Sequence, residues 1–128
     1  MENLIQAPMR MHYQNEQEIE AVVEGFERCW IAKDAFTHRE HLTVAVWYLR
    51  NSTPDQALDS MRAGLFRFLN HHRVGTTKYK EHLTVSWMTL IGTTLAELSP
   101  EHSLLEVTNL VIERLGDPRL IANPQKTE

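Results

Sequence analysis

Five consecutive residues, Glu-His-Leu-Thr-Val, occur at positions 40–44 and return 41 residues later at positions 81–85. The correspondence extends toward the N-terminal side, where His38 aligns with Tyr79. An identity of this length can arise by chance, so the residues around the two copies decide its meaning. Both copies stand near the expected start of an apolar segment with helical spacing. The repeat therefore predicts two related halves, each beginning with a long helix.

Cap-and-proline pairs mark a second helix within each half. Thr53-Pro54 and Ser99-Pro100 each combine a helix-capping residue with a proline, which is favoured at the first position of a helix. Each half then consists of a long helix, a tight turn and a second helix. We expect these two helical hairpins over about residues 36–70 and 77–116.

Apolar spacing of three and four residues predicts one further helix ahead of the repeat, from about residue 15 to 33. Residues 43–48 are β-prone in isolation, but they follow a Thr-x-x-Glu capping box and continue a helical pattern. We therefore expect an all-α fold, a compact bundle of about five helices in one domain over residues 1–128. The segments 1–14 and 119–128 are expected to be loose tails.

Composition narrows the classes of function. The chain has 128 residues, a net charge of −4 and a single cysteine. A basic surface, which nucleic-acid binding requires, is not expected. One cysteine cannot form an intramolecular disulfide and suits a reducing compartment. No stretch approaches the roughly 20 apolar residues of a membrane span. We expect a cytoplasmic protein that binds neither nucleic acid nor membrane, and no feature identifies a small-molecule ligand.

The repeat places histidines where a metal site is conceivable. In an up-and-down bundle, the first and third helices of the repeat lie diagonally and parallel, which puts His41 and His82 at one level. His38 lies one turn before His41 on the same helical face. Imidazole suits divalent zinc, iron, nickel and copper. The predicted ligands are His38, His41, Glu81 and His82, with Glu40 and Tyr79 as supporting residues. Whether such a site would be catalytic stays open.

A different interpretation gives the histidines a structural role. His41 can pack on Phe36, as in the hydrophobic contact that often flanks a helix start. The protein would then be a non-enzymatic interaction module or homo-oligomer, with aromatic residues such as Trp47 and Tyr48 on its contact surface. The three tryptophans, Trp30, Trp47 and Trp87, are expected to serve as core or interface anchors.

The segment Phe36-x-His38-x-x-His41-Leu42, followed some forty residues later by Tyr79-x-Glu81-x-Leu83-Thr84, resembles a group of small uncharacterised bacterial helical proteins. The resemblance covers about residues 36–95 and implies no activity. In that group the second motif reads Tyr-His-Glu-Thr-x-Thr. Here Lys80 replaces the motif histidine and His82 replaces its first threonine, so a histidine-rich site implied by the group would have lost or moved one ligand.

Overall fold

Five α-helices make up most of residues 12–121, the part of the chain that the computed structural model describes. Three short 3-10 turns accompany them, and no strand occurs in that range, which confirms the all-α prediction. The α-helices are α2 (Glu16–Glu27), α3 (His38–Asn51), α4 (Pro54–His71), α5 (Glu81–Ala96) and α6 (Leu104–Leu115). The 3-10 turns are Lys33–Ala35, Thr76–Lys78 and Pro118–Leu120.

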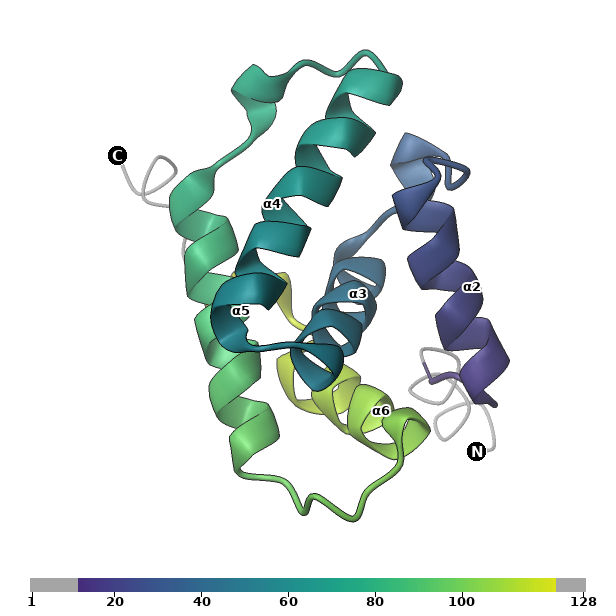
Figure 1. Cartoon of the computed structure of the whole chain (residues 1–128), viewed down its shortest axis with the longest axis vertical. Coiled ribbons are helices and arrows are strands. Elements are labelled where there is room, and N and C mark those ends of the chain that lie inside the picture. The colour runs from purple at the N-terminus through teal and green to yellow at the C-terminus, as the bar shows by residue number, and fades with distance from the viewer. Residues whose placement is uncertain (1–11, 122–128) are drawn as a thin grey trace.

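Helix α3 lies at the centre of the molecule and contacts α2, α4, α5 and α6 (Figure 1). Its residues Leu42 to Val46 are all buried, as expected for a helix surrounded on every side. The expectation that α3 and α5 occupy diagonal corners of an up-and-down bundle is therefore wrong, because these two helices pack directly against each other. The structure does not confirm the repeat as a duplicated architecture.

Side-chain caps explain where three of the helices begin. Asn15 accepts a hydrogen bond from the Glu18 amide at the start of α2. Thr37 precedes α3 and Thr53 precedes α4, each within a capping box. These starts agree with the sequence prediction, because each depends on residues within one turn of the helix end.

The end of α2 was predicted too far along the chain. The helix ends at Glu27, and Cys29 adopts a left-handed conformation with φ 61°. The Trp30 amide donates to the Gly25 carbonyl at 2.7 Å, which completes a Schellman-type end. Trp30 therefore leaves the helical stripe and is 68% exposed, which rules out a place in the core, while a role as an interface anchor stays a prediction. Cys29 itself is buried.

The start of α6 also differs from the prediction. The helix begins at Leu104, and Ser103 forms its capping box with Glu106. Ser99-Pro100 lies in the preceding turn instead. Two cap signals thus stand four residues apart, and the one with a Glu three residues after the cap is used. Helix α5 likewise begins at Glu81 rather than near Lys78, because residues 76–78 form a 3-10 turn.

Close contact between α2 and α4 depends on a glycine. A Cβ atom at Gly64 would lie 2.5 Å from Phe26 Cε2, so the aromatic ring occupies the space of the missing side chain. Phe26 is fully buried and stacks on Phe36, with 4.7 Å between the ring centroids. The absence of a side chain at Gly64 thus permits the close contact between the two helices.

The expected loose tails lie largely outside the described residues, which exclude 1–11 and 122–128. Tyr13 is an exception to the N-terminal expectation, because it is buried. Its hydroxyl lies 2.8 Å from the Thr43 hydroxyl, and its amide donates to Asn109 at 2.8 Å. Residue 13 is thus attached to α3 and α6. No helix of residues 12–121 is long and apolar enough to cross a membrane.

Candidate functional site

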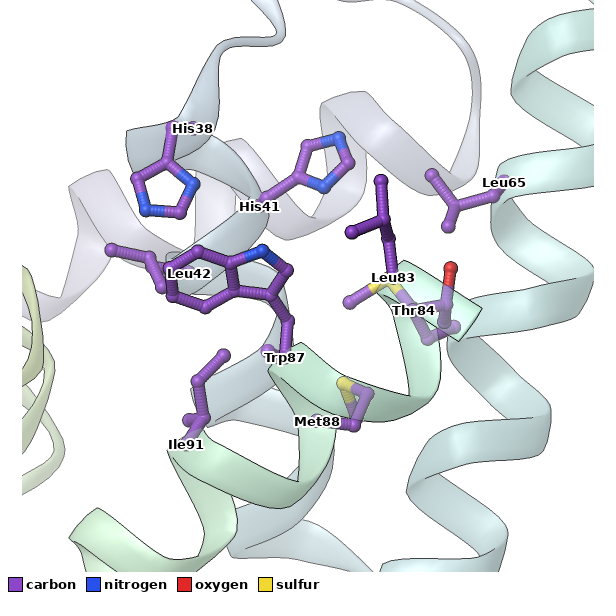
Figure 2. A pocket seen from close by; sticks show the side chains of 11 residues that line it. His38, His41, Leu42, Leu65, Leu83, Thr84, Trp87, Met88 and Ile91 are labelled. Atoms are coloured by element: carbon purple, nitrogen blue, oxygen red, sulfur yellow. The ribbon is translucent and has the colours of Figure 1, made fainter. Parts of the chain in front are cut away.

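A cavity of about 200 Å³ lies between α3, α4 and α5 (Figure 2). Most of its wall is apolar, and its polar side chains are those of His38, His41 and Thr84. Helix α3 supplies both histidines from one face, since residues three apart in a helix are neighbours. The apolar lining residues are Leu42, Ala45, Met61, Leu65, Leu83, Trp87, Met88 and Ile91.

His38 is held in a fixed orientation at this cavity. Its Nε2 lies 2.8 Å from the Leu115 carbonyl oxygen, and its ring meets the Trp87 ring edge-on at 4.6 Å. A carbonyl oxygen only accepts, so Nε2 carries the proton in this contact. Nδ1 of a neutral His38 is therefore left as an acceptor. In Figure 2 the His38 ring stands directly beside the indole of Trp87.

His41 lies one turn further on and is partly buried. Its ring packs on Phe36 at 4.4 Å between centroids, which confirms the contact expected at the helix start. Burial lowers the pKa of His41 to about 4, and nearby His38 adds to the lowering while Glu40 opposes it. The imidazole is thus neutral at pH 7. Neither ring nitrogen has a hydrogen-bond partner among residues 12–121.

A second, outer hollow of about 490 Å³ adjoins the cavity. Four residues line both spaces: His41, Leu65, Leu83 and Thr84. The outer hollow also contains Lys33, Lys78 and Lys80, with Asp34 as its acidic residue. His41 therefore stands where an apolar space meets a space bordered by charged side chains.

The predicted metal ligands on α5 do not join the histidines of α3 in this cavity. Arg62 holds Glu81 through Nε, which lies 2.9 Å from Oε2, and the Tyr79 hydroxyl donates to Glu81 Oε1 at 2.6 Å. These two hydrogen bonds lower the pKa of the Glu81 carboxyl, that from Arg62 having the larger effect. His82 is exposed and lies outside the cavity wall. Tyr79 was predicted to support a metal ligand, and in the structure its hydroxyl supports the ion pair between Glu81 and Arg62.

Glu40, the other predicted supporting residue, caps α3. Its Oε1 accepts from the Thr37 amide at 3.0 Å, and its Oε2 pairs with Arg39 at 3.2 Å. Within the described part of the chain, no three His, Cys, Asp or Glu side chains are grouped so as to hold a metal ion. The four-residue metal site stays a prediction. Of its four residues, the structure brings His38 and His41 to one cavity.

Sequence reasoning missed most of the residues around these two spaces. Trp87 and Leu83 follow the apolar spacing of a core helix, so nothing in the sequence separates a cavity wall from a filled core. Lys33 is distant in the chain from Lys78 and Lys80, and only the fold brings it to the same hollow. Comparison of the chain with family models, curated proteins and solved structures found no match.

Proposed function

We propose that the chain is a small-molecule-binding protein, in which the inner cavity receives an apolar group and His41 bonds to a polar group of the same ligand. The observation that carries the proposal is the neutral imidazole of His41 at the junction of the two spaces, without a hydrogen-bond partner among residues 12–121. The His41 side chain is only partly buried, so its ring nitrogens remain accessible to a ligand in these spaces.

The size and lining of the inner cavity agree with this role. An apolar cavity of about 150 Å³ is enough to take up benzene. At about 200 Å³, the cavity matches one aromatic ring or a short alkyl chain. Ligand pockets are typically apolar with a few polar groups that fix orientation. His38 and Thr84 provide such groups beside His41.

Binding of 4-phenyl-1-butanol, measured by calorimetry, tests the proposal. The wild-type protein is expected to bind this neutral probe in the millimolar range or tighter, as for other small apolar ligands. Ala45→Phe places a ring within the cavity and should abolish binding. Ala63→Phe introduces the same side chain at an exposed position of α4 and should leave binding intact.

Circular dichroism verifies that both variants are folded, and Leu83→Phe offers a second way to fill the space if Ala45→Phe does not fold. Absence of binding to the wild-type protein would overturn the proposal. Equal binding by a folded cavity-filling variant would do the same, because the probe would then sit elsewhere.

A smaller metal site is the second candidate function, and the orientation of His38 favours it. Histidines that bind metals usually donate their other ring N–H to a carbonyl or carboxylate, as His38 does to Leu115. A metal held by His38 and His41 would take further ligands from water or from a bound small molecule. Zinc, iron, nickel and copper suit this pair.

Elemental analysis of protein purified without a histidine tag tests this second candidate. Stoichiometric metal that is lost in the His38→Ala, His41→Ala double variant would support it. Protein that stays free of metal after incubation with each of the four ions would rule it out. The dimerisation alternative has less support: Tyr48 is only 9% exposed, and Trp47 packs partly against the core.

A further inference from the structure

The outer hollow carries a charge opposite to that of the whole chain. Three lysines, Lys33, Lys78 and Lys80, line it together with the single carboxylate of Asp34. The chain as a whole has a net charge of −4. None of the three lysines takes part in an ion pair within residues 12–121. A concave, locally cationic surface on an acidic protein concentrates anions in preference to cations.

The lysines come from two segments that meet at this hollow, the one between α2 and α3 and the one between α4 and α5. Lys33 begins one 3-10 turn, Lys78 ends another, and Lys80 directly precedes α5. Helix α5 begins without a side-chain cap, whereas α2, α4 and α6 each have one. Uncapped amides at a helix start carry partial positive charge. This helix end therefore adds to the positive potential that the ammonium groups create.

The inner cavity and the outer hollow adjoin each other. The inner cavity is apolar and the outer hollow is cationic, and His41, Leu65, Leu83 and Thr84 border both. A molecule that fills the inner cavity and extends outward passes His41 and reaches the lysines. The ring N–H of His41 can donate a hydrogen bond to an oxygen atom at that point.

We propose that the ligand of this site is a small amphipathic carboxylate, with an aromatic ring or short alkyl chain in the inner cavity and its carboxylate among Lys33, Lys78 and Lys80. This inference rests on the proposed function and adds the chemical class of the ligand. Lysine ammonium groups act as compact point charges, so three of them accept a carboxylate without a fixed bidentate geometry.

A matched pair of probes separates the contribution of the anionic group to binding from that of the apolar group. The probes are 4-phenylbutyrate and 4-phenyl-1-butanol, which share a ring and chain and differ in the charged end. The wild-type protein is expected to bind the carboxylate about tenfold more tightly at low ionic strength. Raising the salt concentration to 0.3 M should reduce this preference and leave the alcohol unaffected.

Variants that remove charged side chains show which residues cause the preference for the carboxylate probe. The triple variant Lys33→Gln, Lys78→Gln, Lys80→Gln should lose the roughly tenfold preference while it still binds the alcohol. The control variant Arg50→Gln, Arg114→Gln, Arg119→Gln removes the same charge from exposed positions away from the hollow and should keep the preference.

The outcomes distinguish the two proposals. If both probes bind with equal affinity, or if the lysine variant keeps the preference, the carboxylate inference is wrong and the apolar pocket stands. If neither probe binds, the pocket itself fails and the inference fails with it. A preference lost equally in the arginine control would also overturn it, since the effect would then come from net charge alone.

Discussion

The two copies of Glu-His-Leu-Thr-Val have the same sequence and different surroundings. In the first copy, Leu42 is 1% exposed and Thr43 is fully enclosed, with its hydroxyl beside that of Tyr13. In the second copy, Leu83 and Thr84 are only partly buried and line the site. Both copies contribute to the cavity wall, but the leucine, threonine and valine of the first copy are buried in the core, whereas those of the second are only partly buried. Identical segments thus acquire different roles from the packing around them.

The difference begins at the helix starts. Thr37 caps α3, so Glu40 is the third residue of that helix and accepts the Thr37 amide. Lys78 stands at the aligned position before the second copy and offers no oxygen to cap a helix. Helix α5 therefore begins two positions later in the alignment, at Glu81. Because the Glu81 carboxylate does not take part in a helix cap, it is available to pair with Arg62.

The histidines show the same divergence. His41 faces the junction of the two spaces and packs on Phe36, whereas His82 is exposed. Helix α3 is surrounded by four helices, so its first turns are enclosed, while α5 lies toward the outside (Figure 1). The site is accordingly asymmetric, with its histidines on α3 and much of its apolar wall on α5.

The largest expected effect on stability comes from truncating the leucine of the first copy, compared with truncating that of the second. Leu42→Ala should lower the free energy of unfolding by about 3 kcal/mol, because a fully buried leucine leaves a cavity. Leu83→Ala should cost about 1 kcal/mol, since this side chain is only partly buried. Urea denaturation at pH 7 measures both. Equal losses would mean that the two copies are packed alike.

The next effect is a pH dependence that separates the two histidines. The folded pKa of His41 is about 4, below the ordinary 6.5. Between these values the unfolded chain binds a proton that the folded chain does not, so stability is full above about pH 6.5 and falls as the pH approaches 4. The loss attributable to His41 reaches about 3 kcal/mol at the acid end.

His41→Gln removes this titration, so its stability should decline less than that of the wild type between pH 7 and pH 4.5. His82→Gln is the same substitution at the exposed copy, and its stability curve should follow the wild type. Urea denaturation across this pH range provides the measurement. The comparison fails if His41→Gln retains the full acid destabilisation.

Local signals explain which parts of the fold could be predicted. Thr37 and Thr53 cap helices through bonds that span one turn, so the sequence identified the starts of α3 and α4. The end of α2 was missed because Cys29, a residue without the freedom of glycine, adopts the left-handed conformation there. That conformation depends on the surrounding packing, which a single sequence does not display.

The candidate site was predicted in part. His38 and His41 share a helical face, and the structure places both at the cavity. The pairing of His41 with His82 depended on a symmetric bundle, and the central position of α3 removes that symmetry. Arg62, which holds Glu81, stands 19 residues before it on another helix, so no spacing rule could have revealed the ion pair.

The most direct test is an NMR spectrum of the histidine ring nitrogens, recorded with and without 4-phenylbutyrate at pH 7. The account predicts that the ring signals of His41 shift when the probe is added, because that imidazole bonds to the ligand at the junction of the two spaces. Those of His82, the same residue in the second copy, should stay unchanged. Unchanged His41 signals at a saturating probe concentration, or equal shifts at both histidines, would contradict it.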